Sequence, residues 1–412
     1  MVNSVAEKNK KPEIRFKGFT DEWNEQKYSE TFTNIPNNTL SRAELNYNIG
    51  LAKNVHYGDV LIKFGELLDV EKNEIPFITD DDLANKFRPS KLQNGDVVIA
   101  DAAEDETVGK CTELVNVGEE IVVSGLHTIP IRPTLFFASG FLGYFMNSSA
   151  YHNQLLRLMQ GTKVSSISKT ALQDTAIVYP IDKEEQSQIG KFFKQLNQHI
   201  TLHQRKYDKL ITIKKAMLEK MFPKNGADVP EIRFNGFTET WKEQEINAMA
   251  DRYDNLRVPI TANKRVPGST PYYGANGIQD YVKGHTHHGE FILVAEDGAN
   301  DLKNYPVQYV NGKIWVNNHA HVLQAQKNIA DNKFLMYAIS QTNIEPFLVG
   351  GGRAKLNAET MMKIGVYVPL NIQEQEHIGW YFTKIDKLIT LHQQELVKLK
   401  SIKKACLGKM FV

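Results

Sequence analysis

The hydrophobic pattern of the chain is dominated by two long amphipathic stretches, residues 182–222 and 371–412. In both, apolar side chains recur at alternating spacings of four and three residues, which is the heptad pattern of helices that pack along one seam. Each stretch follows a proline and opens with a capping residue, Asp182 or Asn371, with a glutamate three positions later, as in a capping box. The pattern predicts two helices of about 40 residues, each roughly 60 Å long.

Each predicted helix has a single apolar stripe, so each needs a partner, and the nearest candidate is the other copy. We expect the two copies to pair antiparallel about a dyad, with His203 and His392 meeting near the centre. A buried polar pair of this kind can set the register, although two partly solvated histidines fit the same pattern. The predicted seam consists of Ile189, Phe193, Leu196, Ile200, His203, Tyr207 and Leu210 on the first helix and Ile378, Phe382, Ile385, Ile389, His392, Leu396 and Leu399 on the second.

A second repeated segment confirms that the chain is internally duplicated. Residues 12–26 read PEIRFKGFTDEWNEQ, and residues 230–244 read PEIRFNGFTETWKEQ. The alternation over 13–16 suggests a strand, and Trp23 and Trp241 are its expected core anchors. The expected organisation is a leader (1–11), a first globular domain (12–181), a first long helix (182–222), a linker (223–229), a second globular domain (230–370) and a second long helix (371–412).

The blocks between the repeats, 27–166 and 245–355, share little sequence with each other. The first contains β-rich runs at 60–64 and 97–100 and a helical stretch at 135–159. The second has turns rich in Tyr, Asn, Gly, Asp and His, followed by a helix at about 332–341. The fold class is therefore α+β, with two globular α/β domains separated by a pair of long antiparallel helices and related by a pseudo-twofold. Recognition is expected in the blocks that vary.

Composition fits a folded protein: of 412 residues 42% are hydrophobic and 24% charged. Cys111 and Cys406 form no CxxC pair, so neither a disulfide framework nor a zinc knuckle is predicted. The apolar run 135–146 is too short to span a bilayer, and the N-terminus lacks an apolar signal core, so a cytoplasmic location is expected. The net charge of +1 does not by itself indicate a nucleic-acid partner.

Catalytic motifs are missing from the sequence. There is no Pro-Pro dipeptide, so the [N/D]PPY loop of adenine methyltransferases is absent, and no GxxxxGK[ST] phosphate loop is present. Asp105, Glu106 and Lys110 have a nuclease-like spacing without a supporting strand pattern. The histidines at 285–288, with His319 and His321, lack a cysteine or carboxylate at a regular spacing, so no metal site is predicted.

These features together resemble the specificity (S) subunits of Type I restriction-modification systems. The resemblance covers essentially the whole chain. Its carriers are the helix starts EEQSQIG and QEQEHIG, the helix ends KKAMLEKMF and KKACLGKMF, the PEIRF repeats, and YYGANGIQDYV with EDGAN. It implies two target-recognition domains, each reading one half of a split double-stranded DNA target, in a chain that is not itself an enzyme.

The same resemblance implies the partners. Two modification subunits, which methylate adenine with S-adenosylmethionine, would bind this chain, and restriction subunits that use ATP and Mg would join them. The alternative is a coiled-coil adaptor whose globular blocks bind proteins rather than DNA.

Candidate DNA contacts follow from the pairing of side chains with bases and phosphates. In the second block they are Tyr273, Asn276, Tyr281, Asn300, Lys303, Asn317 and Asn318, with Arg353 or Lys355 on phosphate. In the first block they are Lys110, His127, Thr128 and Lys163. Glycine-rich turns at 161–163 and 350–353 precede short helices, and their amides suit a phosphate, although an ordinary capped helix fits equally well.

Overall fold

The computed structural model describes residues 10–161, 164–224, 227–350 and 354–412. It divides into two compact units, residues 1–203 with 395–412 and residues 204–394, called the first and second unit below. The division falls inside each long helix, so each unit contains the beginning of one helix and the end of the other. No helix in the described ranges is long and apolar enough to cross a membrane.

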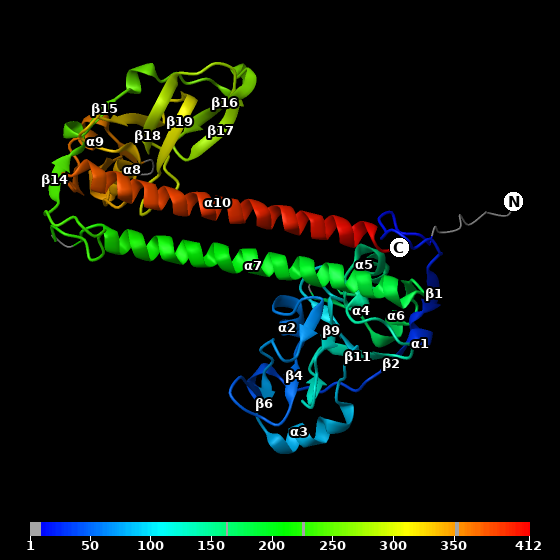
Figure 1. Ribbon diagram of the computed structural model, residues 1–412. Helices are drawn as coiled ribbons and strands as arrows, with labels where there is room; N and C mark the ends of the chain where they lie inside the picture. Colours follow the sequence, from blue (N-terminus) through cyan, green and yellow to red (C-terminus); the bar gives the residue numbers. More distant parts are fainter. Residues whose placement is uncertain (1–9, 162–163, 225–226, 351–353) are drawn as a thin grey trace. The chain divides into compact units, whose positions relative to one another are not determined.

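The two predicted long helices are confirmed as α7 (Lys183–Met221) and α10 (Ile372–Lys409) (Figure 1). In the first unit, Phe193 near the start of α7 stacks on Phe411, just beyond the end of α10, with ring centroids 5.7 Å apart. In the second unit, Phe222, just beyond the end of α7, lies 6.1 Å from Phe382 near the start of α10. Within each unit the two helices are therefore antiparallel.

All the predicted seam residues are buried or half-buried. Phe193 and Phe382 are completely buried. His203 and His392 are half-buried and belong to different units, so their meeting stays a prediction.

Each repeated segment is anchored to the first turn of a long helix. Arg15 binds the buried carboxylate of Glu185 through Nε at 2.6 Å and Nη2 at 2.8 Å, and the Trp23 indole donates to the same carboxylate at 3.3 Å. The two glutamates predicted to close capping boxes, Glu185 and Glu374, thus serve as anchors. Asp182 and Asn371 do cap, because their Oδ1 atoms accept from the amides two residues on, at 2.8 and 2.9 Å.

Trp23 and Trp241 are both only 2% exposed, which confirms them as core anchors. The strand predicted over 13–16 is wrong, because these residues follow an irregular path fixed by the anchoring arginine. The strands lie further on: β1 (Asn24–Lys27) pairs antiparallel with β13 (Ala176–Tyr179), and β14 (Lys242–Glu245) pairs antiparallel with β23 (Gly365–Val368).

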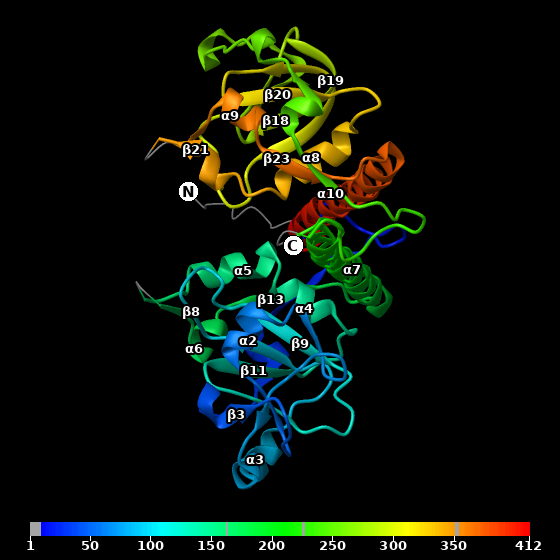
Figure 2. The ribbon, with the colours of Figure 1, turned by 90° about the vertical axis from the view of Figure 1, so that its left-hand side faces the viewer.

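The two blocks contain the same sheet although their sequences differ. Strand order is β2-β11-β7-β9-β5 in the first unit and β15-β20-β18-β19-β16-β17 in the second. The first three neighbouring pairs are antiparallel and the fourth is parallel in both sheets. β18 pairs with β19 on one side and with β20 on the other, and the three strands are labelled in Figure 2.

The strands of the first sheet are β2 (Phe32–Asn34), β11 (Thr128–Pro133), β7 (Val97–Ala100), β9 (Cys111–Val115) and β5 (Leu67–Asp69). Those of the second are β15 (Ala250–Arg252), β20 (Ala320–Ala325), β18 (His287–Ala295), β19 (Val307–Val316), β16 (Pro267–Gly274) and β17 (Gly277–Val282).

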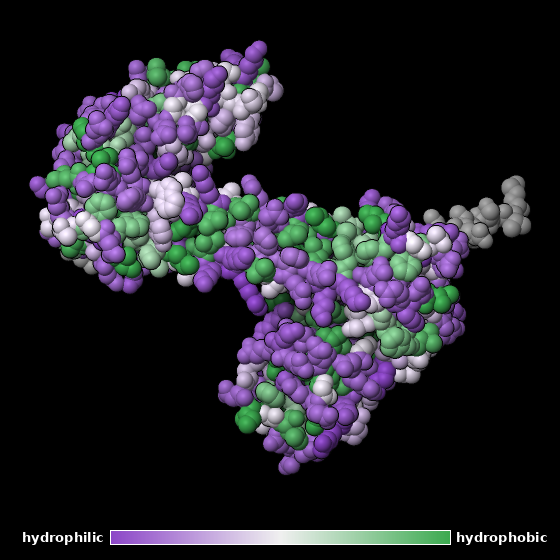
Figure 3. Space-filling view, viewed as in Figure 1, coloured by the Kyte–Doolittle hydropathy of each residue, from purple (hydrophilic) through white to green (hydrophobic). Residues whose placement is uncertain are grey.

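What is attached to this common sheet differs between the units. The first unit adds a four-stranded sheet of β10 (Val122–Ser124), β4 (Lys53–Val55), β6 (Phe77–Ile78) and β3 (Leu45–Asn46), with α3 (Asp81–Phe87). The second unit instead extends the common sheet by one strand, β17, which forms a hairpin with β16. On the face seen in Figure 3, hydrophilic side chains cover most of the surface of both blocks.

Four predicted elements can be compared directly. The strand at 97–100 is β7, and the helix at 332–341 is α8 (Asn332–Ser340). The stretch 135–159 contains two helices, α4 (Phe141–Met146) and α5 (Ser149–Leu156). The strand predicted at 60–64 is wrong, because these residues enter α2 (Tyr57–Ile62), whose first turn is capped by the His56 side chain at 3.2 Å from the Gly58 amide.

The remaining short elements are α1 (Tyr28–Thr31), α6 (Lys169–Leu172), α9 (Ala358–Met362), β8 (Ala102–Ala103), β12 (Ser165–Ser166), β21 (Leu348–Val349) and β22 (Lys355–Leu356).

Candidate nucleic-acid interface

In the first unit, Asp101 and His127 lie together where β7 ends, and this polar edge of the sheet is called the rim. The Asp101 amide donates to the His127 carbonyl at 3.1 Å, and the Asp101 carbonyl accepts from the Ile167 amide at 2.9 Å. The Asp101 carboxylate also lies 3.2 Å from His127 Nδ1, and the ring of His127 packs edge-on against Tyr57. Burial raises the pKa of Asp101, although His127 and Lys169 act in the opposite direction.

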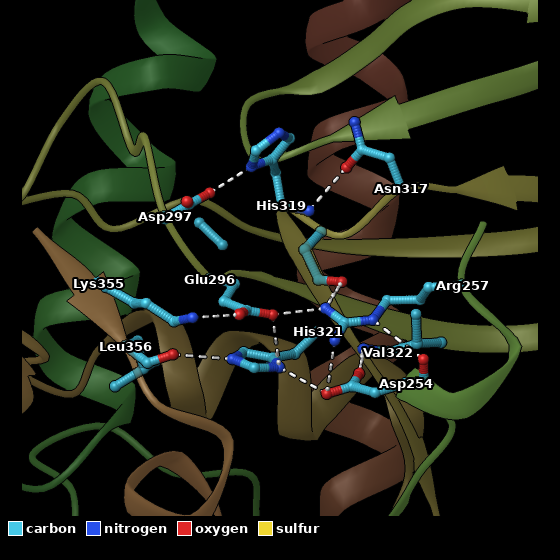
Figure 4. Close-up of polar contacts among 12 residues, drawn as sticks. Asp254, Arg257, Glu296, Asp297, Asn317, His319, His321, Val322, Lys355 and Leu356 are labelled. Atoms are coloured by element: carbon cyan, nitrogen blue, oxygen red, sulfur yellow. Dashed lines mark hydrogen bonds and ion pairs between the residues drawn. The ribbon is translucent and has the colours of Figure 1, made fainter. Parts of the chain in front are cut away.

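In the second unit, the end of β18 forms the same rim. The Glu296 amide donates to the His319 carbonyl at 2.9 Å, and the Glu296 carbonyl accepts from the Leu356 amide at 2.7 Å. The His319 ring binds through Nδ1 to the next carboxylate, Asp297, and its backbone amide donates to Asn317 Oδ1 at 2.8 Å. Figure 4 shows His319 between Asp297 and Asn317.

The two rims correspond in strand register. Strand register pairs Thr128 with Ala100 in the first unit and Ala320 with Ala295 in the second, so His127 and His319 each precede the paired residue. By the same register, Ala102 pairs with Ser166 as Asp297 pairs with Lys355. The common sheet therefore brings His127 and His319 to the same place in both units. The carboxylate bound to each ring comes from positions one residue apart, because Asp101 is equivalent to Glu296 and not to Asp297.

Beside this rim, the second unit holds a half-buried ionic network (Figure 4). His321 binds Asp254 through Nδ1 at 2.7 Å and the Leu356 carbonyl through Nε2 at 2.9 Å. Glu296 is bound by Arg257 at 2.6 Å and by Lys355 at 2.9 Å.

Burial acts to raise the pKa values of the two carboxylates in this network. The hydrogen bond from His321 nevertheless leaves the pKa of Asp254 below its ordinary value. The hydrogen bonds from Lys355 and Arg257 do the same for Glu296. Each carboxylate is thus held in its ionised form.

Ligand atoms of Asp254, Glu296 and His321 lie within 4.8 Å of one another, a spacing that suits a metal ion. However, Arg257 and Lys355 already neutralise Glu296, and both ring nitrogens of His321 are hydrogen-bonded. The donor set therefore fits an ionic cross-link between β20, β22 and the loops beside them better than a cation site. The sequence did not reveal this cluster, because its carboxylates lie far from His321 along the chain.

Six of the candidate residues of the second block are exposed: Asn276, Tyr281, Asn300, Lys303, Asn318 and Lys355. Asn276 and Asn300 meet, because Asn276 Oδ1 accepts from the Asn300 amide at 3.0 Å while its Nδ2 donates to the Gly298 carbonyl at 2.9 Å. Tyr273 is half-buried, in contact with an apolar cluster of the sheet.

The predicted base contact of Asn317 is corrected, because this residue is only 3% exposed. Its side chain accepts from His319 and lies 3.4 Å from Gln279, so it supports the rim and has almost no surface for a base.

Two candidates in the first block are bound within their own domain, and of these Thr128 is corrected while the contact of Lys110 stays a prediction. Thr128 is fully buried, and its hydroxyl is bound to Ser124 and to the Gly125 carbonyl. Lys110 is half-buried and donates to the Leu61 carbonyl at 2.8 Å, and burial lowers its pKa. His127 is exposed, with 51% of its side-chain surface accessible. Lys163 and Arg353 lie outside the described residues.

The capped-helix interpretation of the glycine-rich turns is supported in the first unit. Ser168 Oγ accepts from the Ala171 amide at 3.1 Å at the start of α6. Helices α6 and α9 have only four and five residues, so neither has an extended N-terminal dipole to offer a phosphate.

The sequence-based choice of contacts overlooked Lys169, Arg257 and His319 as rim residues. The only local signal was an Ala followed by an acid at the end of an apolar run, at Ala100-Asp101 and Ala295-Glu296. That signal acquires meaning only once the strands are paired.

A family model described as the type I restriction modification DNA specificity domain matches residues 3–212 and 238–401. The chain belongs to this family. Each matched segment includes all or part of a repeated segment, one variable block and most of the long helix that follows, which confirms the duplication and the resemblance seen in the sequence.

Specificity subunits are also the relatives of this chain. A Haemophilus influenzae protein named as a type I restriction enzyme specificity subunit is 41% identical over 153 residues, which are 37% of this chain and 39% of that protein. A Methanocaldococcus jannaschii protein named as the MjaX specificity subunit is 22% identical over 84% of this chain and 81% of its own length. The chain thus spans about two fifths of the first of these relatives.

The fold matches that of a solved specificity subunit. The crystal structure of the type I restriction-modification S subunit from M. genitalium superposes with a TM-score of 0.69 at 12% identity, covering 98% of this chain and 99% of the other. The predicted fold class, two α/β blocks and a pair of long helices in an internal duplication, is confirmed.

Proposed function

We propose that this chain is the DNA-reading subunit of a type I restriction-modification system and that each unit reads one half of a split target. The observation that carries the proposal is the common sheet with different attachments. Both units share the order of five strands and a histidine at the same place of the rim, but one adds a four-stranded sheet and the other the strand β17. A scaffold used twice with different attachments is suited to two different half-sites.

Exposed side chains of the second unit supply the chemistry for base recognition. Asn300 and Asn318 are exposed amides, which suit adenine, and Lys303 is an exposed ammonium, which suits guanine. The near-neutral charge of the chain means that partners must contribute much of the phosphate neutralisation. The chain carries no methyltransferase or ATPase motif, so catalysis belongs to those partners.

The partners we propose are two modification subunits and, in the full complex, restriction subunits. S-adenosylmethionine, ATP and Mg would bind to them rather than to this chain. Two modification subunits are favoured because the anchors of the two units are nearly identical: Arg233 binds Glu374 at 2.6 and 2.7 Å, as Arg15 binds Glu185. Two similar repeats can hold two equal partners. Native mass spectrometry of the assembled complex measures this stoichiometry.

The deciding experiment is to express the chain with its modification subunit in a host and to map methylated adenines. We expect one bipartite motif with a fixed gap. The isolated chain, incubated with S-adenosylmethionine and DNA, should transfer no methyl group. Absence of any new motif, together with no DNA shift by the complex, would favour the adaptor alternative.

A further inference from the structure

We propose that His127 in the first unit and His319 in the second, which occupy equivalent positions, contact the DNA phosphate backbone, each with the help of a lysine of its own rim, Lys169 or Lys355. This inference rests on the proposed function, because it assigns the part of each unit that touches the strand irrespective of its sequence.

His127 and His319 occupy equivalent positions in the two units. Both histidines lie at the same register position of the common sheet, with a main-chain carbonyl bound by the acidic residue that ends the neighbouring strand. The blocks around them share little sequence. Two half-sites that differ in their bases still share a backbone, so a residue type kept at one place in two unlike blocks suits a phosphate.

Both histidine rings are held in a fixed orientation. In both units Nδ1 of the ring is bound to a carboxylate, Asp101 or Asp297. This contact places a proton on Nδ1 and fixes the ring plane, and in the protonated ring Nε2–H is the second donor. The side chains are 51% and 35% exposed, so a ligand can reach them.

Each rim also has an exposed lysine. Lys169 is exposed at the start of α6 and acts electrostatically on Asp101. Lys355 is exposed in β22, binds Glu296 at 2.9 Å and acts on Asp297. Each rim therefore combines an oriented imidazole with an exposed ammonium, and both groups can donate to a phosphate.

The test uses the complex of the full chain with its modification subunit, bound to a fluorescent duplex that contains the mapped motif. We expect His319→Ala and His127→Ala each to weaken binding about tenfold, as for the loss of a hydrogen bond to a charged group. The slope of log K against log salt should become shallower by up to about 0.9 for each. The methylated motif should not change.

Matched controls are His285→Ala in the second unit and His199→Ala on α7, both exposed histidines away from the rim. They should leave affinity unchanged. His127→Arg and His319→Arg should retain affinity, because arginine keeps a cationic donor. Since the two rims lie in separate units, the losses of the double alanine variant should multiply.

Unchanged affinity in both alanine variants would overturn the inference, and so would a changed base preference, which would make these residues base readers. If an alanine variant does not fold, judged by its melting curve, the comparison of His→Gln with His→Arg decides: equal affinity of the two overturns the phosphate contact. If the wild-type complex itself neither binds nor methylates a specific motif, the proposed function fails instead.

Discussion

The guanidinium of Arg233 binds both oxygens of the buried Glu374 carboxylate, at 2.6 and 2.7 Å. This pair joins a repeated segment to the first turn of α10, and Trp241 donates to the same carboxylate at 3.3 Å. Arg15, Glu185 and Trp23 repeat the arrangement on α7. The anchor is therefore a structural unit that the chain uses twice.

Removing one partner of this anchor should destabilise the second unit strongly. We expect Arg233→Met to lower the free energy of unfolding by about 3–5 kcal/mol, because it leaves the Glu374 carboxylate buried and unpaired. Chemical denaturation measures the loss. Lys242→Met, an exposed neighbour, is the control and should change stability by less than about 0.5 kcal/mol. Adding Glu374→Gln to Arg233→Met should recover part of the loss; additive losses would contradict a direct coupling.

The ion pair between Lys403 and Glu66, 2.6 Å long, makes the first unit sensitive to acid. Burial acts to raise the pKa of Glu66, but Lys403 and the amide of Asn197 leave it below its ordinary value of 4.5. A depressed acidic pKa contributes stability above pH 4.5, and that contribution is lost as the pH falls through the folded-state pKa. Thermal melting between pH 3 and pH 7 measures it.

In Lys403→Met the acid-sensitive contribution should disappear, and the stability at pH 7 should fall by about 3 kcal/mol because Glu66 is left without its cation. The neighbouring exposed Lys404→Met should behave like the unchanged chain. An unaltered pH profile in Lys403→Met would show that the pair contributes nothing.

Two adjacent asparagines can be compared: Asn317 supports the rim from inside, and Asn318 is an exposed candidate for contact with DNA. Asn317→Ala should lower the free energy of unfolding by about 1–2 kcal/mol, because it removes the acceptor of the His319 amide inside the rim. Asn318→Ala should leave stability within about 0.5 kcal/mol but weaken or relax recognition of one half-site, by about 1–3 kcal/mol. Calorimetry and methylation mapping separate the two effects. The reverse pattern would mean that the exposed surface is misassigned.

Because α7 and α10 connect the two units, their length is expected to set the gap between half-sites. Inserting seven residues, one heptad, into both helices adds about 10 Å while preserving the seam. This is about three base pairs at 3.4 Å each. We expect the mapped motif to gain about three unspecified positions with both halves unchanged. An unchanged gap would refute this role of the helices.

Local regularity explains which parts of the fold could be predicted. The heptads of α7 and α10 extend over tens of residues, and β7 and α8 are apolar runs bounded by clear turns, so each was visible without its neighbours. The strand predicted at residues 60–64 was wrong because Val60, Leu61 and Ile62 suit a strand or a buried helix equally well. The cap supplied by His56 decided in favour of the helix.

The candidate site was predicted less completely, for the same reason. By residue type alone, Asn317 and Asn318 are equally good candidates for contact with DNA, and so are Thr128 and His127. Neighbours in a strand or tight turn, however, face different environments. Only the strand pairing showed that Asn317 and Thr128 are buried while Asn318 and His127 are exposed.

By itself the sequence determined the duplication, the two long helices, the buried tryptophan anchors and the family, because repetition and heptad spacing are properties of the chain read in order. The tertiary structure decided that the two unlike blocks share one sheet. It also brought Asp101 to His127, Asp254 to His321 and Arg15 to Glu185. These contacts join residues far apart in the chain, and their geometry depends on strand register and helix packing, which no local pattern of residue types encodes.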